Sequence, residues 1–139
     1  MTECVVDASV AVKWYVPEVY SDNAARLLNE DCQLNGPDLL LPEFGNILWK
    51  KHVRNELDES DVRAIIRAIS IVPLQIHSSQ ALLEGAVEIA IHTKRTVYDS
   101  LYLALAIWLK CPFLTSDDRL VNALQGTHLS AHLLHVKDY

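Results

Sequence analysis

Residues 98–118 read YDSLYLALAIWLKCPFLTSDD, and this stretch predicts a helix, a break and a buried strand in close succession. Apolar side chains at helical spacing favour a helix over residues 98–110, which the following Cys-Pro pair ends. Residues 113–115 are short and apolar, as expected for a strand. Asp99 lies near the start of the first helix, and Asp117 follows the strand at the start of another. The stretch therefore predicts a helix–strand–helix unit of an α/β fold, with an acid at each helix start.

The same alternation runs through the rest of the chain. The sequence predicts strands at residues 3–6, 33–35, 71–76 and 133–136, and helices at 8–14, 20–28, 43–53, 58–69, 79–92 and 117–124. Pro73 suggests an edge position for the third strand, because proline cannot donate a ladder hydrogen bond. Pro42 suits the start of the third helix, and we expect its inward face to include Trp49. Strands that alternate with helices predict a mostly parallel central sheet with helices on both faces.

Composition predicts one soluble domain over residues 1–139. Half of the residues are apolar and 22% are charged, which is typical of globular proteins. The three cysteines are odd in number and lack zinc or disulfide spacing, so we expect free thiols in a reducing compartment. We find neither a basic leader at the N-terminus nor the roughly 20 consecutive apolar residues that span a bilayer. A cytoplasmic protein without membrane contact is the expectation.

The net charge of −6 argues against a non-specific grip on nucleic acid. Such a grip depends on lysine and arginine side chains that replace the counterions around phosphates. Any chemistry on nucleic acid must therefore come from a local site, or through a bridging metal ion.

Four acids are expected to meet at one site. Asp7 and Asp117 follow predicted strands, whereas Glu43 and Asp99 lie in the first turns of predicted helices. In an open parallel sheet these positions converge beyond the carboxyl ends of the strands. Carboxylates held close together repel one another and need a cation, and oxygen ligands suit Mg²⁺ or Mn²⁺ rather than zinc. The chemistry expected of such a site is metal-assisted phosphodiester hydrolysis, although each acid alone also fits a helix cap or a helix dipole.

Four blocks of sequence carry a family resemblance: VVDASV at 5–10, PEFGN at 42–46, YDSLYLALA at 98–106 and TSDDRL at 115–120. With these blocks in this order, the chain resembles the VapC toxins of the PIN-domain family over its whole length. The resemblance implies a three-layer α/β/α sandwich around a mostly parallel sheet. It also implies an Mg²⁺- or Mn²⁺-dependent endoribonuclease of a type II toxin–antitoxin system, a homodimer, and inhibition by a VapB-like antitoxin.

The resemblance also implies roles for individual residues. Asp7, Asp99 and Asp117 correspond to metal ligands, and Glu43 corresponds to a ligand or a water-orienting base. The motif favours Asp117 over the adjacent Asp118, which more simply supports the start of a helix.

Five further residues are candidate supporting or substrate-binding groups. The hydroxyls of Ser9 and Thr115 match motif positions that hold the acids. Asn46 lies three residues after Glu43 and either bonds a carboxylate or substrate, or packs as a helix amide. Lys50 and Arg54 lie near one helical stripe with Glu43, so they either guide RNA phosphates towards the acids or form a solvated helix end.

Three other functions compete with the ribonuclease. A phosphatase-like hydrolase would use Asp7 as a nucleophile, but no second acid follows two residues later. A catalytically silent binding module would keep the fold without the chemistry, although all four acids are present. A DNA nuclease would use the same metal chemistry.

Two other features have plainer interpretations. His128, His132 and His135 have spacings of four and three, which on a helix would place them on one face and could form a metal site. We expect a loop followed by a strand here instead, which would break that face. Surplus apolar surface, including tryptophans, predicts a homodimer interface or an antitoxin groove.

Overall fold

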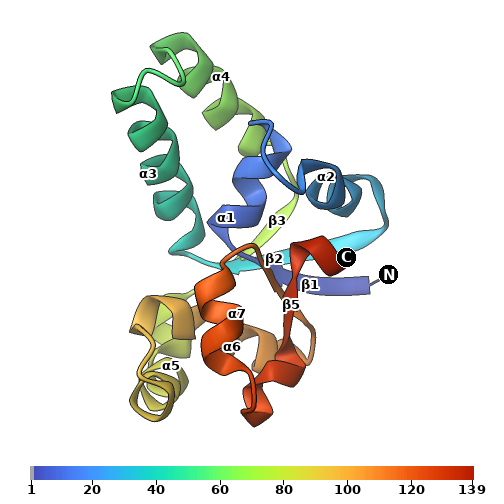
Figure 1. The fold of residues 1–139 in the computed structure, drawn as a ribbon, viewed down its shortest axis with the longest axis vertical. Coiled ribbons are helices and arrows are strands. Elements are labelled where there is room, and N and C mark those ends of the chain that lie inside the picture. Colours follow the sequence, from blue (N-terminus) through green and yellow to red (C-terminus); the bar gives the residue numbers. More distant parts are fainter. Residues whose placement is uncertain (1) are drawn as a thin grey trace.

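The computed structural model describes residues 2–139, which form a five-stranded sheet in the order β3-β2-β1-β4-β5 (Figure 1). All four strand pairings are parallel. The strands are β1 (Thr2–Val6), β2 (Cys32–Pro37), β3 (Leu74–His77), β4 (Phe113–Thr115) and β5 (Leu133–His135). Because β1 lies between β2 and β4, its carboxyl end, where Asp7 follows, is central to the sheet.

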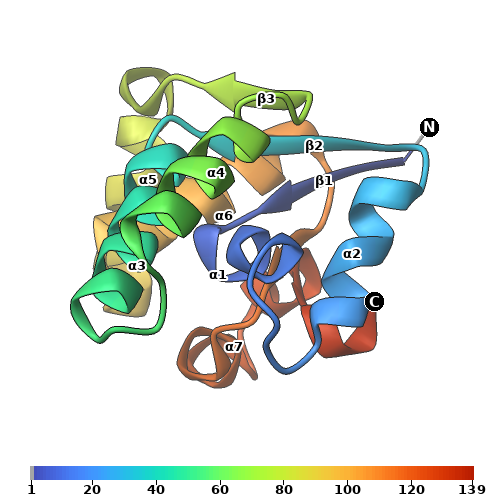
Figure 2. The same cartoon turned by 90° about the horizontal axis from the view of Figure 1, so that it is seen from above.

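Helices cover both faces of the sheet. They are α1 (Ala8–Ala11), α2 (Ser21–Asn29), α3 (Leu40–Val53), α4 (Glu59–Ile69), α5 (Ser79–Thr93), α6 (Val97–Leu109) and α7 (Asp118–Leu124). Three short 3-10 turns complete the chain: η1 (Val12–Trp14), η2 (His128–His132) and η3 (Val136–Asp138). Helices α1 to α4 lie on one side of the sheet, and α5 and α6 pack together on the other (Figures 1 and 2). The predicted three-layer α/β/α architecture is confirmed.

The core lies on both faces of β1. Val5 and Val6 have no exposed surface, and neither do Leu40 and Leu48 of α3 or Leu103 of α6. A central parallel strand covered on both faces must be apolar throughout, which explains the continuous Cys4–Val6 run. Each fully buried aliphatic side chain contributes about 1.5–3 kcal/mol to folding. These contacts make the end of β1 a rigid support for Asp7.

Two predictions about the third helix were wrong. It begins at Leu40 rather than Glu43, because Leu40 is fully buried and extends the apolar stripe by a turn. Pro42 then falls within the first turn, where a backbone N–H would have no helical partner anyway. Trp49 does not face the core; 57% of its surface is exposed, since Phe44 and Leu48 occupy the buried stripe.

The strand predicted from residue 71 begins only at Leu74, directly after Pro73. It lies at the edge of the sheet, as the proline indicated. The last strand ends one residue earlier than predicted, at His135.

The three cysteines are free, as predicted. Cys4 and Cys111 are buried and Cys32 is half-buried, with 3.4 Å between the sulfurs of Cys4 and Cys32. They gather at the amino-terminal end of the sheet, opposite Asp7. Within residues 2–139, none of the helices has the length and apolar character that crossing a bilayer requires.

Candidate functional site

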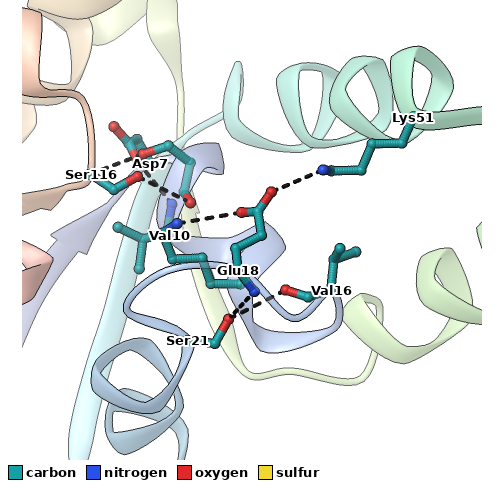
Figure 3. A network of polar contacts seen from close by, with 9 residues as sticks. Asp7, Val10, Val16, Glu18, Ser21, Lys51 and Ser116 are labelled. Carbon is teal, nitrogen blue, oxygen red and sulfur yellow. Dashed lines mark hydrogen bonds and ion pairs between the residues drawn. The ribbon is translucent and has the colours of Figure 1, made fainter. Parts of the chain in front are cut away.

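Asp7 lies directly after β1 and caps the start of α1. Its Oδ1 accepts hydrogen bonds from the Val10 backbone N–H at 3.2 Å and from the Ser9 hydroxyl at 2.5 Å (Figure 3). Its Oδ2 accepts a hydrogen bond from the Thr115 hydroxyl, at the end of the neighbouring strand β4. The two predicted supporting hydroxyls therefore hold the two oxygens of this carboxylate.

Burial raises the pKa of Asp7 to about 6, although the hydrogen bonds from Ser9, Thr115 and Val10 oppose the shift. The negative charge of Glu43 adds to the rise. The acid is held in one orientation, and its ionisation is made costly by its surroundings.

Asp117 caps the start of α7, beside Asp7. Its Oδ1 accepts hydrogen bonds from the backbone N–H groups of Arg119 at 3.0 Å and Leu120 at 3.3 Å. Its own N–H donates to the Thr115 hydroxyl oxygen at 3.1 Å, so this hydroxyl connects it with Asp7. The helix cap fixes the carboxylate near the end of β4.

Asp118 points elsewhere. Its Oδ1 is 3.0 Å from Nε2 of the buried His135, which is close enough for an ion pair. The geometry does not meet that of a hydrogen bond, and among residues 2–139 this ring nitrogen finds no hydrogen-bond partner. Asp118 is 78% exposed, so Asp117 is the member of the pair that lies towards the other acids.

Asp99 lies in the first turn of α6, and its N–H donates to the capping Thr96 hydroxyl at 3.1 Å. Its Oδ2 accepts a hydrogen bond from Nη2 of Arg95 at 3.2 Å. Burial raises the pKa of Asp99, the charge of Arg95 opposes this, and the charge of Asp117 raises it further. Sequence reasoning missed Arg95, which lies just before the Thr96 cap of α6; a cation close in sequence to Asp99 was the available signal.

Glu43 lies in the first turn of α3, where its Oε1 accepts a 2.6 Å hydrogen bond from the Tyr102 hydroxyl. Burial raises the pKa of Glu43, the Tyr102 hydrogen bond opposes this, and the charge of Asp99 raises it further. The Tyr102 ring is buried and stacks on Phe113 of β4, with 5.3 Å between ring centroids.

Tyr102 was also missed by sequence reasoning. Its pKa is raised by burial and by its hydrogen bond to Glu43, and further by the charges of Glu43, Asp7 and Asp99. Its place three residues after Asp99, one turn along α6, was the available signal. This hydroxyl contacts Glu43 and is close enough to Asp7 and Asp99 for their charges to act on it.

The structure brings the four predicted acids into one region. The charge of Glu43 acts on Asp7, that of Asp99 on Glu43, and that of Asp117 on Asp99. Even so, across residues 2–139, three or more His, Cys, Asp or Glu side chains nowhere converge closely enough to hold one ion as they stand. Asp99 is turned to Arg95 and Glu43 to Tyr102, so a shared ion requires rotation of these side chains.

The donor set nevertheless fits a hard divalent cation. All of the converging groups are carboxylates or hydroxyls, which suit Mg²⁺ and Mn²⁺. The raised pKa values of Asp7, Glu43 and Asp99 show that burial destabilises these three negative charges and that neighbouring carboxylates contribute. A cation would remove both penalties.

The remaining predicted residues lie on α3 or, in the case of Arg54, directly after it. Asn46, three residues after Glu43, is exposed, and no hydrogen bond from its side chain occurs within residues 2–139. Lys50 and Arg54 are also exposed, and together with Ser9 they line a hollow of about 230 Å³. Two of these three side chains thus lie beside the acidic region.

The three histidines lie on two different elements. His128 and His132 lie at the two ends of the 3-10 helix η2, where a loop was predicted, whereas His135 is buried in β5, where a strand was predicted. His135 therefore does not share a helical face with the other two.

Comparison with known proteins gives a family. The PIN domain profile matches residues 4–123. The ribonuclease VapC3 of Pyrobaculum aerophilum is 35% identical over 118 residues, which cover 84% of this chain and 90% of that protein. The ribonuclease VapC1 of Mycobacterium tuberculosis is 34% identical over 124 residues, covering 88% and 92% respectively.

Solved structures share the fold. The protein PAE2754 of Pyrobaculum aerophilum superposes with a TM-score of 0.71 at 20% identity, covering 99% of this chain and 85% of that one. The toxin VapC20 of Mycobacterium tuberculosis, which cleaves the sarcin-ricin loop, gives 0.65 at 16% identity, covering 86% and 94%. A chain of a toxin–antitoxin complex from Klebsiella pneumoniae gives 0.60 at 13% identity, covering 96% and 97%. Together with the profile match and the two ribonuclease relatives, this shows that the chain belongs to the PIN-domain family and is a VapC-type member of it.

Proposed function

We propose that this protein is a Mg²⁺- or Mn²⁺-dependent endoribonuclease, the toxin of a type II toxin–antitoxin system. Asp7, Glu43, Asp99 and Asp117 form its metal site in this proposal. The observation that carries it is the approach of these four carboxylates, from four different elements, at the carboxyl end of one sheet. The relatives that are named ribonucleases support the choice of RNA as substrate.

The acids have different tasks in this proposal. Asp7 and Asp117 are held by helix caps and hydroxyls, so they provide the fixed part of the site. Asp99 and Glu43 are held by one side chain each, so they can turn towards a cation or a water molecule. A bound Mg²⁺ supplies a polarised water and neutralises charge on the phosphate.

Glu43 is the proposed ligand or water-orienting base. The Tyr102 hydroxyl donates to one of its oxygens, which leaves the other for a water molecule or the cation. Asn46, on the same helix and exposed, is proposed to contact the RNA next to this carboxylate.

The phosphatase alternative is less well supported. A nucleophilic aspartate of that kind is expected to have a second acid two residues later, but Ser9 occupies that position and its hydroxyl donates to Asp7. A silent binding module would not need four ionisable groups held at a cost in charge repulsion. Sugar preference between RNA and DNA is decided by substrate tests.

Partners follow from the apolar surface and the comparisons. Ile91 and Trp108, on α5 and α6, are 71% and 61% exposed, and Leu83 is 50% exposed. We propose that this face forms the homodimer, since large exposed apolar patches mark interfaces. A VapB-like antitoxin is the proposed inhibitor, and the cytoplasm the proposed location. A monomeric mass at micromolar concentration would contradict the homodimer.

The test uses purified protein with structured and single-stranded RNA, in Mg²⁺ or Mn²⁺, beside a chelator control. The Asp7→Asn and Asp99→Asn variants are nearly isosteric and should lose cleavage. Asp118→Asn is the matched control, since Asp118 contacts His135 and points away from the other acids. Cleavage that survives chelation, or that Asp7→Asn leaves intact, would contradict the proposed site.

A further inference from the structure

A second charged network lies beside the acidic region. Glu18, in the loop before α2, has Oε2 at 2.9 Å from Nζ of Lys51 and Oε1 at 3.4 Å from Nζ of Lys13 (Figure 3). The side chains of Lys13 and Lys51 are only 9% and 16% exposed. The network therefore ties the loop to α3 and holds Lys51 in a fixed position.

Glu18 and Lys51 of this network line the hollow of about 230 Å³ that Lys50 and Arg54 also line. Ser9 and Ser116 are part of the same lining. The Ser116 N–H donates to the Ser9 hydroxyl oxygen at 3.1 Å, and this hydroxyl donates to Asp7. A group bound in the hollow would thus be one hydroxyl away from the carboxylate that ends β1.

The charge of the hollow is opposite to that of the protein. Its lining has three cations, Lys50, Lys51 and Arg54, against one anion, Glu18, in a chain with a net charge of −6. The negative end of a helix dipole stabilises cations in the last turn, which accounts for the presence of lysine and arginine at the end of α3. The dipole does not account for a carboxylate from another loop that fixes Lys51, or for the hollow that opens on Ser9.

We propose that this hollow binds one phosphate of the RNA that neighbours the cleaved phosphate, through Lys50, Lys51 and Arg54. Glu18 is a positioning residue that keeps Lys51 at the wall of the hollow. The proposal rests on the proposed ribonuclease function and adds where the RNA backbone enters. Four carboxylates repel a polyanion, so a cationic subsite next to them supplies the attraction that the acidic surface lacks.

The role of Glu18 has a distinctive sign. If Glu18 were only a counter-charge, its removal would make the hollow more positive and strengthen RNA binding. If it positions Lys51, its removal leaves two ammonium groups facing each other, and Lys51 turns away. Glu18→Gln should then weaken RNA binding although it adds positive net charge.

The experiment measures kcat and KM for RNA cleavage, and the affinity of a short fluorescent oligouridylate for Asp7→Asn protein at several salt concentrations. The double variant Lys50→Gln with Arg54→Gln is made in the wild-type protein and in Asp7→Asn. In both it should weaken RNA binding roughly tenfold, the size of effect expected for the loss of charge-assisted hydrogen bonds. The salt slope should fall by about 0.7, the value for one phosphate on a single strand. KM should rise while kcat changes little, since the reacting phosphate lies elsewhere.

Lys110→Gln is the matched control, because Lys110 follows α6 beside Cys111 at the other end of the sheet. It should change neither KM nor the salt slope, and all variants should keep the melting temperature within a few degrees.

Two results would overturn the proposal: an unchanged salt slope in the double variant, or tighter RNA binding by Glu18→Gln. If the double variant bound a poly-glutamate peptide less tightly but bound RNA as the wild type does, the proposal would also be wrong, and the hollow would be assigned to an acidic protein segment instead. The binding arm needs no cleavage, so a protein that binds as predicted but does not cut RNA contradicts the proposed function alone.

Discussion

The two ends of the central strands bury ionisable groups in different ways. At the amino-terminal end, burial raises the pKa of the Cys111 thiol to about 11 and that of Cys4 still higher. Both thiols are neutral at pH 7 and behave as small apolar residues. At the carboxyl end, burial raises the pKa of Asp7 to only about 6, because three hydrogen bonds stabilise its ionised form.

The difference separates a structural cluster from a functional one. A thiol with a raised pKa has no charge to compensate at neutral pH. A carboxylate with a pKa near 6 is largely ionised at pH 7 and remains close to other negative charges. The predictions below test whether that cost exists and whether a cation relieves it.

The largest expected effect contrasts one residue from each end. Asp7→Asn should lower kcat/KM for RNA more than about a hundredfold, since loss of outer-sphere partners alone costs about 10–100-fold. Cys4→Ala should leave kcat/KM within about twofold, because Cys4 is remote from the acids, although it removes a small buried side chain. Steady-state cleavage assays of the two variants measure the contrast; equal losses would remove the distinction between the two ends.

The second prediction concerns pH in the absence of metal. The pKa of Asp7 is about 6 in the folded protein and 3.8 as its reference value, so the folded state binds its proton more tightly. The stability that this proton provides is present at low pH and is lost as pH rises through about 6. Carboxyl groups with lowered pKa values, such as Glu18 and Asp58, stabilise the folded state when they are ionised. Their contribution to stability appears at lower pH and is complete above about pH 5.

Between pH 5 and 7 the melting temperature of the chelated protein should therefore fall by roughly 4 °C, for about 1.3 kcal/mol. Asp7→Asn should flatten this part of the profile. A melting temperature that rises steadily from pH 5 to 7, both in the wild-type protein and in Asp7→Asn, would contradict the claim that ionisation of Asp7 costs stability.

The third prediction uses the hydroxyl shared by two acids. Thr115→Val keeps the shape of the buried side chain but removes a donor to Asp7 and an acceptor for the Asp117 N–H. Cleavage should fall about tenfold, as for other residues that orient metal ligands. The acidic limb of the pH–rate profile should move to higher pH, because the lost bond stabilised ionised Asp7. Ser130→Ala, a distant exposed hydroxyl, is a control that should change neither quantity.

The smallest effect is expected at Arg95, which competes with a cation for Asp99. Arg95→Gln breaks a partly exposed ion pair, worth about 0.5 kcal/mol of folding stability. The variant should bind Mn²⁺ a few-fold more tightly, since Asp99 is then free to turn. Calorimetric titration measures this change, and weaker Mn²⁺ binding would mean that Arg95 orients Asp99 instead.

Local patterns predicted the elements that carry the acids. The apolar spacing after Asp99 and the short strands before Asp7 and Asp117 are visible within a few residues, and so is the family resemblance of the four blocks. The choice of Asp117 over Asp118 came from the family motif, and the structure adds that Asp117 is the residue that caps α7.

Contacts between distant segments could not be predicted in this way. Tyr102 meets Glu43 across 59 residues and Lys51 meets Glu18 across 33, and both depend on how helices pack on the sheet. Trp49 was assigned to the wrong face because an apolar residue beside a buried stripe does not reveal whether the stripe is already full. The acids and the two hydroxyls that hold Asp7 were predictable, whereas Tyr102 and Arg95, which hold Glu43 and Asp99, were not.

The central claim is that these four carboxylates share a divalent cation. Its most direct test is calorimetric Mn²⁺ titration of the wild-type protein, Asp99→Asn and the control Asp118→Asn at pH 7. We predict saturable binding by the wild-type protein and Asp118→Asn, and binding weakened at least tenfold in Asp99→Asn. Equal Mn²⁺ affinity in all three proteins, or an absence of binding to the wild type at millimolar Mn²⁺, would contradict the claim.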